Sequence, residues 1–157
     1  PAAIADRAAL AAAAVLLVYA FVGCGRRTGA PAHRASVTLT PGVLNPDVRQ
    51  ETIGTTICHH GWTASIRPPT SYTTPLKVRQ MAEYGVGGQP SAYQEDHLIS
   101  LELGGDPRDP RNLWPEPYPR AAAVDRIENE LNARVCAGEL SLAAAQHEES
   151  RLKHEDG

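Results

Sequence analysis

A carboxylate and an imidazole stand next to each other in the middle of the chain, at Asp96 and His97, and a carboxamide follows at Asn112. A carboxylate is a good ligand for hard divalent cations, and an imidazole accepts a proton near neutral pH. The pair therefore brings a metal ligand and a candidate general base together. Because neighbouring residues of a regular strand point to opposite faces, a shared site requires the strand to bend or bulge there.

The segment that must position these residues is predicted to be a β-hairpin. Residues 96–103 have the apolar pattern of a half-buried strand, carried by Leu98, Ile99, Leu101 and Leu103. Residues 104–107, Gly-Gly-Asp-Pro, are typical of a turn. Residues 112–114 can form the returning strand, which the prolines at 115 and 117 are expected to end.

A helix is predicted directly after the hairpin, over residues 120–136. Its apolar residues recur at a helical period, so this face is expected to pack on the hairpin: Val124, Ile127, Leu131 and Val135. Asp125 and Glu128 lie three residues apart on a neighbouring face. The helix therefore offers two carboxylates close to the predicted strand with Asp96 and His97.

Shorter helices are predicted on both sides of this unit. Thr74 and Pro75 are suited to begin one helix, and Gly85 can end it. A last helix is predicted over 142–153, with its charges exposed at Glu148, Glu149, Arg151 and Lys153. Thirteen prolines and thirteen glycines in 157 residues favour a loop-rich domain over a helical bundle. The predicted fold class is therefore α+β.

The order of these features resembles the HNH endonucleases, the ββα-metal or His-Me finger group. Residues 96–117, DHLISLELGGDPRDPRNLWPEP, resemble more closely a bacterial branch of exported HNH-like proteins. In that branch a Cys-x-x-Gly-Trp segment and an Arg-Pro-Pro-x-Ser-Tyr-Thr segment come first, and here these are residues 58–62 and 67–73. The resemblance spans roughly residues 40–142. It implies a small core in which a β-hairpin packs on a helix.

The resemblance implies a role for each residue of the motif. His97 corresponds to the general base that deprotonates water, and Asp96 to a ligand of a divalent cation. Asn112 corresponds to the residue that holds the base and its loop in position. The implied reaction is hydrolysis of a phosphodiester bond in nucleic acid, with DNA as the expected substrate.

The helix is where the chain departs from the family pattern. The usual ligand position, about nine residues after the Asn, is Ala121 here, and alanine cannot bind a metal ion. Asp125, on the next turn, is the predicted replacement, with Glu128 and Asn129 as further candidates. Carboxylate ligands favour Mg²⁺ or Mn²⁺ over zinc, which prefers His and Cys.

The N-terminal part of the chain predicts export. Residues 8–23 form an apolar run behind Arg7, and the run ends at Gly23-Cys24, which resembles a bacterial lipobox. Residues 1–24 are therefore interpreted as a signal peptide with lipobox or as a membrane anchor. An ordinary secretory signal and a buried Ala-rich helix are the alternatives. Residues 25–36 are predicted to be a flexible linker, and residues 37–157 the HNH-like domain.

The cysteines support the same interpretation. If Cys24 is lipidated, Cys58 and Cys136 remain, and in an exported chain they are expected to form a disulfide. In a cytosolic chain they would be two buried free thiols. His59 and His60, beside Cys58, lack the spacing of a zinc site and are predicted to be surface residues.

Composition limits what the chain can bind by charge alone. A net charge of −3 with 21% charged residues does not fit a protein that clings to nucleic acid through its charge. The first hypothesis is an exported metal-dependent HNH endonuclease, either secreted or membrane-anchored as a lipoprotein. The second is a catalytically inactive HNH-like envelope lipoprotein that serves as a binding module. A hydrolase or toxin-like domain with another substrate is a third. No protein partner is evident from the sequence.

Overall fold

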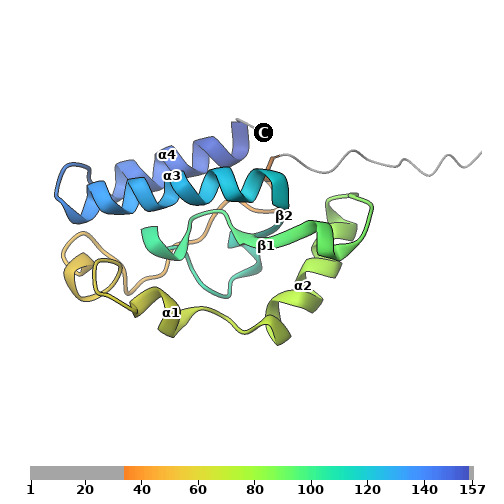
Figure 1. The fold of residues 1–157 in the computed structure, drawn as a ribbon, viewed down its shortest axis with the longest axis horizontal. Helices are drawn as coiled ribbons and strands as arrows, with labels where there is room; N and C mark the ends of the chain where they lie inside the picture. The colour runs from red at the N-terminus through yellow and green to blue at the C-terminus, as the bar shows by residue number, and fades with distance from the viewer. Residues whose placement is uncertain (1–33, 156–157) are drawn as a thin grey trace, which may run out of the picture.

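The computed structural model describes residues 34–155, so the predicted signal or anchor segment and most of the predicted linker lie outside the described residues. Within this range the chain is an α+β fold, as predicted. A two-stranded antiparallel hairpin lies between one helix on one side and a pair of helices on the other (Figure 1). The helices and strands are α1 (Trp62–Ile66), α2 (Thr70–Glu83), β1 (Tyr93–His97), β2 (Leu113–Pro117), α3 (Tyr118–Cys136) and α4 (Leu142–Glu155).

The hairpin pairs β1 with β2 in a register that sets Tyr93 opposite Pro117 and His97 opposite Leu113. The predicted first strand was placed too late, because β1 ends at His97 and residues 101–103 form a 3₁₀ turn. The returning strand runs on through both prolines that were expected to end it. Each strand of a two-stranded sheet has one edge without a partner strand. A proline is tolerated where its nitrogen faces this free edge, because no hydrogen bond to the partner strand is lost there.

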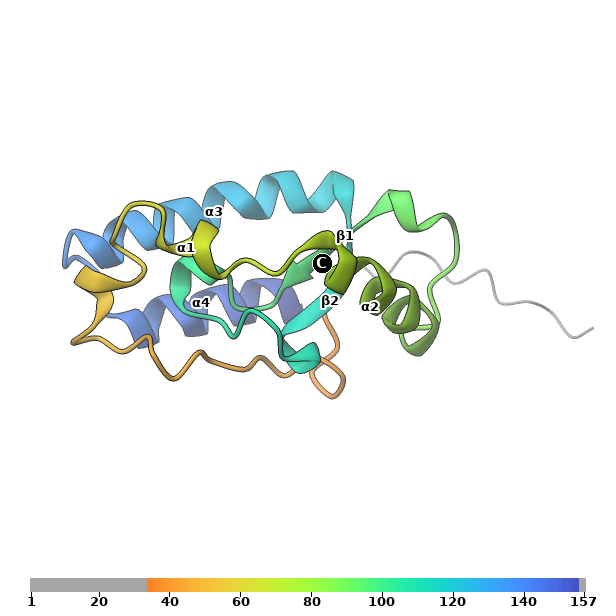
Figure 2. The same cartoon turned by 90° about the horizontal axis from the view of Figure 1, so that it is seen from below.

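Helices α3 and α4 run side by side in opposite directions over one face of the hairpin (Figures 1 and 2). The buried face of α3 carries three of the four residues of the predicted apolar period, Val124, Leu131 and Val135, while Ile127 is only partly buried. Ala121 and Glu128 are buried on the same helix. The face of α4 that is buried includes two charged residues, Glu149 and Lys153. The prediction that these two side chains are exposed is therefore wrong.

Helix α2 packs against the hairpin on the side away from α3 (Figure 1). It begins at Thr70, four residues before the predicted start, so that Pro75 lies inside the helix. The side chain of Gln80 joins α2 to the hairpin region, because its Nε2 donates to the carbonyls of Pro110 at 2.8 Å and Leu113 at 2.7 Å. These bonds hold α2 against β2.

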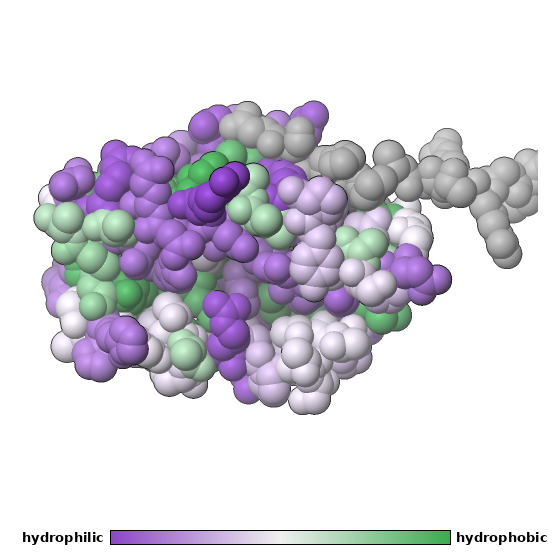
Figure 3. Space-filling view, in the orientation of Figure 1, coloured by the Kyte–Doolittle hydropathy of each residue, from purple (hydrophilic) through white to green (hydrophobic). Residues whose placement is uncertain are grey.

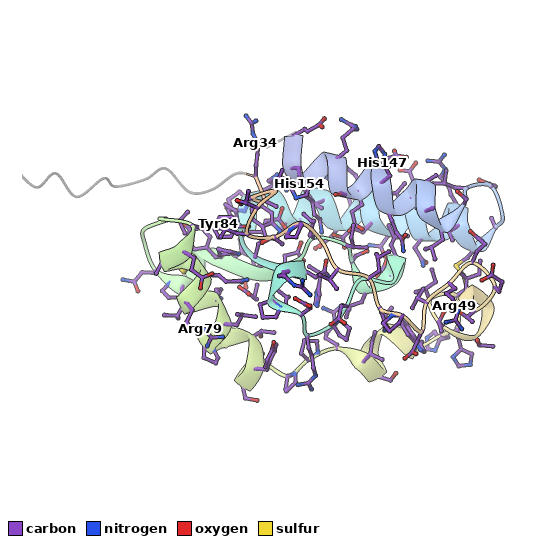
Figure 4. The ribbon with its side chains drawn as sticks, turned by 180° about the vertical axis from the view of Figure 1, so that it is seen from behind. Arg34, Arg49, Arg79, Tyr84, His147 and His154 are labelled. Carbon is purple, nitrogen blue, oxygen red and sulfur yellow. A yellow bond between two sulfur atoms is a disulfide. The ribbon has the colours of Figure 1, made fainter. Side chains whose placement is uncertain are left out.

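The apolar core has two parts. The larger lies between α3, α4 and the 3₁₀ turn, and it also takes in side chains from the N-terminal part of the domain. The smaller contains Leu98 and Trp114, with Tyr84 packed against them. Two side chains beside it hold the first described residues in place through Thr40. The Tyr84 hydroxyl lies 2.6 Å from Thr40 Oγ1, and His154 Nε2 lies 3.0 Å from the Thr40 carbonyl oxygen (Figure 4).

The predicted disulfide is present between Cys58 and Cys136, whose Cα atoms are 5.6 Å apart. It joins the loop before α1 to the end of α3. His59 and His60 beside it are exposed, as predicted. The face drawn in Figure 3 is mostly hydrophilic, with apolar residues in small separate patches. Among residues 34–155, none of the helices has the length and apolar character needed to cross a membrane.

Candidate active site

His97 is the last residue of β1 and is buried, with 5% of its surface exposed. Its Nε2 lies 3.2 Å from the carbonyl oxygen of Pro107, in the turn between the two strands. Burial lowers the pKa of His97, while Asp96 and the Pro107 carbonyl oppose the shift. The imidazole is therefore neutral at neutral pH, and donation from Nε2 leaves Nδ1 as the proton acceptor.

Asn112 clamps the chain on both sides of this turn. It is fully buried, and its Oδ1 accepts from the backbone N–H of Ile99 at 3.0 Å and of Val43 at 3.4 Å. Its Nδ2 donates to the carbonyls of Ile99 and Asp106, each at 3.0 Å. Because Asp106 precedes Pro107, the carboxamide fixes the backbone that carries the carbonyl partner of His97. These bonds also explain why β1 ends at His97. The side-chain carboxamide of Asn112, and not a partner strand, binds the backbone N–H and carbonyl of Ile99.

Asp96 meets a cation that the sequence did not reveal. Its Oδ2 accepts from Nζ of Lys153, 2.9 Å away, and Lys153 comes from the end of α4. The same ammonium donates to Glu128 on α3 and to the carbonyl oxygen of His97, and it lies 3.2 Å from Glu149 Oε1. Lys153 is completely buried. A side chain predicted to face solvent therefore lies at the centre of the site.

A signal for this arrangement exists in the sequence. Leu142, Ala145, Glu149 and Lys153 follow one another at intervals of three or four residues, so they share one face of α4. An acidic and a basic residue on an otherwise apolar helix face are compatible with a buried ion pair. They are equally compatible with a frayed end of the helix, where both charges face solvent. The sequence does not tell which distant residues complete such a pair, here Asp96 and Glu128, so burial of Lys153 could not be predicted.

Three carboxylates share this one ammonium, which sets their protonation. Although burial acts in the opposite direction, Lys153 holds the pKa of Asp96 below its ordinary value. Burial raises the pKa of Glu128 to about 9, against the pull of Lys153. Burial also raises the pKa of Glu149, which accepts from the backbone N–H of Ser100 at 2.9 Å. One positive charge does not balance three negative ones in a dry interior, so the cluster retains a proton at neutral pH.

Two further carboxyl groups near the hairpin behave in the same way. Burial raises the pKa of both Glu95 and Glu116 to about 8, and the Asp96 carboxylate adds to each shift. Glu116 is paired with Arg120 four residues later. The region around β1 and β2 therefore takes up protons that the unfolded chain would release.

Four of the five predicted site residues, all except Asn112, line one small pocket of about 50 Å³. Asp96, His97, Asp125 and Glu128 all line it, together with Arg67 and Glu102. Asp125 is largely exposed. The partial desolvation of its carboxyl group raises its pKa, and the negative charge of Asp96 raises it further. Arg67, from the segment between α1 and α2, is an exposed cation at the same pocket that was not predicted as a site residue. Ala121, by contrast, is buried in the packing of α3.

The arrangement does not fit a metal ion centred on Asp96. One oxygen of Asp96 is bound by Lys153 and the other accepts from Gln94 Nε2 at 3.2 Å. Glu128 also gives an oxygen to Lys153. Within residues 34–155, no three His, Cys, Asp or Glu side chains form a group able to hold a metal ion. The divalent ion therefore stays a prediction.

Chemically, the site combines a neutral imidazole held by a carbonyl, an exposed guanidinium and a polar pocket. Such a set can deprotonate a small molecule such as water beside an anionic group. Ser100 also lines the pocket, and its buried hydroxyl has no hydrogen-bond partner in the described structure. Comparison of the chain with protein-family models, with curated proteins and with solved structures found no match.

Proposed function

We propose that this chain is an exported HNH-type endonuclease that hydrolyses phosphodiester bonds of nucleic acid, with DNA as the expected substrate. The observation that carries the proposal is the state of His97. Its ring is buried, faces a backbone carbonyl through Nε2 and belongs to the lining of a polar pocket, and we infer that its other nitrogen acts as the base. The lowered pKa keeps this base unprotonated at neutral pH.

In the proposed reaction, His97 takes a proton from a water molecule whose oxygen attacks the phosphorus atom. The bond between phosphorus and the leaving oxygen of the sugar breaks, and that oxygen takes a proton from solvent. Arg67 is exposed at the same pocket, so its guanidinium can pair with the charged phosphate. Asn112 acts through position, because it fixes the turn that carries the carbonyl partner of His97.

The order of elements supports the same proposal. A hairpin whose first strand ends in Asp96-His97 is followed directly by α3, which packs on both strands. This is the order expected for the ββα core that the sequence motif resembles. Since Asp96 and Glu128 are both bound to Lys153, no step of the proposed reaction is assigned to a metal ion.

Export is part of the proposal. A disulfide between Cys58 and Cys136 is stable in an oxidising compartment such as the bacterial cell envelope. The proposed lipid or hydrophobic anchor in residues 1–24, and with it the contact with a membrane, lies outside the described residues.

A second candidate is a non-catalytic binding module of the envelope. The observation that favours it is the ion pairing of Asp96 and Glu128 with Lys153, which occupies carboxylates that a metal-dependent nuclease needs. In that case the fold is kept for binding, and His97 has a structural role.

The decisive experiment incubates the purified full chain with plasmid DNA, single-stranded DNA and RNA, each with Mg²⁺, with Mn²⁺ and with EDTA. We expect cleavage of at least one substrate, and a loss of roughly 10²–10⁴-fold in rate for His97→Ala, the usual contribution of a general base. His147→Ala is the matched control, because His147 is exposed on α4 and does not line the pocket of His97 (Figure 4).

Circular dichroism must show that both variants remain folded. If the parent cleaves nothing, or if the His97→Ala chain cleaves as fast as the parent, the nuclease proposal fails and the binding module takes its place.

A further inference from the structure

The ammonium of Lys153 is surrounded by oxygen atoms from three separate elements. Strand β1 supplies Asp96 Oδ2 at 2.9 Å and the carbonyl oxygen of His97, helix α3 supplies Glu128, and α4 itself supplies Glu149 at 3.2 Å. Three carboxylates and a backbone carbonyl are the kind of shell that a hard divalent cation takes in proteins. Here the shell is closed around a side chain with no exposed surface.

Asp96 is the residue that the sequence motif marks as a metal ligand, and Glu128 is one of the further candidates on the helix. Asp96 and Glu128 direct a carboxylate oxygen at Lys153 instead. A divalent ion at the same oxygens would be within a few ångströms of the ammonium, and two cations at that distance in a dry interior repel each other strongly. Lysine and divalent ion therefore exclude one another at this position.

The lysine also holds the backbone next to the candidate base. Nζ donates to the carbonyl oxygen of His97, while Glu149 accepts from the backbone N–H of Ser100 at 2.9 Å. The chain between these two residues is thus fixed from the side of α4. On its other side, Asn112 binds Ile99.

We propose that Lys153 is the built-in cation of this site: it positions Asp96 and the backbone of His97, keeps divalent ions out, and leaves a divalent-cation site of Asp96, Glu128 and Glu149 when it is removed. The ligand of that opened site is a hard, oxygen-binding ion of the class of Mg²⁺, Mn²⁺ and Ca²⁺. Lys153 is a positioning residue, because it is buried behind the pocket and contacts His97 only through the backbone.

The first experiment titrates the full parent chain with Mn²⁺, followed by electron paramagnetic resonance of the free ion and by thermal unfolding with Mn²⁺ or EDTA. The parent is expected to show no saturable Mn²⁺ binding that depends on Asp96, and no change in its unfolding temperature with either addition. Saturable binding that Asp96→Asn abolishes would overturn the proposal.

The second experiment repeats the titration on Lys153→Met, which has a similar length and no charge. It is expected to bind one Mn²⁺ saturably, at least roughly tenfold more tightly than any residual binding by the parent, since affinity follows the number of free carboxylates. A Lys153→Met/Asp96→Asn chain should lose this gain. The matched control is Lys77→Met, which removes a lysine that donates to another β1 carbonyl, that of Tyr93 at 2.8 Å, and should not gain Mn²⁺ binding.

Three carboxylates without a cation destabilise the fold, so Lys153→Met is expected to unfold at a lower temperature without metal and to recover with Mn²⁺. Recovery supports the proposal. A Lys153→Met chain that binds no Mn²⁺, or that stays unfolded when Mn²⁺ is present, overturns it. The binding readout is independent of cleavage, so failure of the nuclease assay and failure of the ion exchange are separate results.

Discussion

Asn112 uses both ends of its carboxamide on buried backbone groups, so its loss is expected to be costly. Asn112→Ala leaves the N–H and carbonyl of Ile99 and the carbonyl of Asp106 without their partner. Each buried unpaired group costs about 1–3 kcal/mol, and we therefore expect the free energy of unfolding to fall by roughly 3 kcal/mol or more. Urea unfolding measures this change.

Asn129→Ala is the control for this prediction, because Asn129 is exposed on α3 and its Nδ2 donates to the carbonyl of Asp125 within its own helix. Its effect should stay within about 0.5 kcal/mol, as for other surface substitutions. Equal losses from the two variants would contradict the clamp assigned to Asn112.

The raised pKa values near the hairpin predict how stability depends on pH. Glu128 has a pKa of about 9 in the fold against 4.5 for the ordinary side chain, and Glu95 and Glu116 are raised to about 8. The folded chain therefore holds protons that the unfolded chain has released. The contribution of these groups to the free energy of unfolding is complete below about pH 4.5, where both states are protonated. It falls as pH rises toward 8 to 9, by at most about 1.4 kcal/mol per pH unit for each proton.

Glu128→Gln should flatten this slope, because glutamine does not ionise. Glu130→Gln, which removes a carboxyl group at an exposed position of the same helix, is the matched control. Urea midpoints measured from pH 5 to pH 9 test both variants. A parent protein that becomes more stable across this range would show that the carboxyl groups are ionised in the fold.

At the scale of the elements, the connection between β1 and β2 tolerates only glycine at position 105. A Cβ atom there would lie 1.8 Å from the carbonyl oxygen of Ile99 and 2.6 Å from Nδ2 of Asn112. Both atoms belong to the clamp, so neither can move without breaking it. Gly105→Ala is therefore expected to prevent folding or to destabilise the chain by more than about 3 kcal/mol, at the upper end of single substitutions.

Gly54→Ala provides the comparison, since a Cβ atom there meets nothing within 4 Å and its backbone does not require glycine. That substitution should leave the urea midpoint almost unchanged. If Gly105→Ala unfolds at the same denaturant concentration as Gly54→Ala, the close packing of the turn on Ile99 is wrong.

The elements that the sequence predicted well are those with a regular apolar period. The face of α3 with Val124, Leu131 and Val135 is buried as its 3.6-residue spacing predicted. The end of β1 was missed because a side chain 13 residues away, Asn112, replaces the strand partner of Ile99. The start of α2 differs from the prediction because Pro75 lies inside the helix and not at its first position.

The candidate site divides in the same way. The motif and the helix singled out Asp96, His97, Asp125 and Glu128, and the structure brings these four side chains to one pocket, while their roles stay a prediction. Lys153 was missed because its partners lie 57 and 25 residues away along the chain, and no local pattern records such distances.

At the scale of the whole molecule, the disulfide ties the front of the domain to the end of α3. Cys58 and Cys136 are 78 residues apart, so the bond restricts a large part of the unfolded chain. Replacing both by serine is expected to lower the free energy of unfolding by about 2–4 kcal/mol. Urea unfolding with and without reductant measures it: reductant should shift the parent by a similar amount and leave the double variant unchanged.

The burial of Lys153 has a consequence for how this fold opens. Surface helices at the edge of a domain commonly fray by themselves, and their amide protons then exchange early. Lifting α4 would pull its ammonium from Asp96 and Glu128 and break both buried ion pairs. Helix α4 is thus bound to β1 and to α3, and we expect α4 to open together with them rather than by itself.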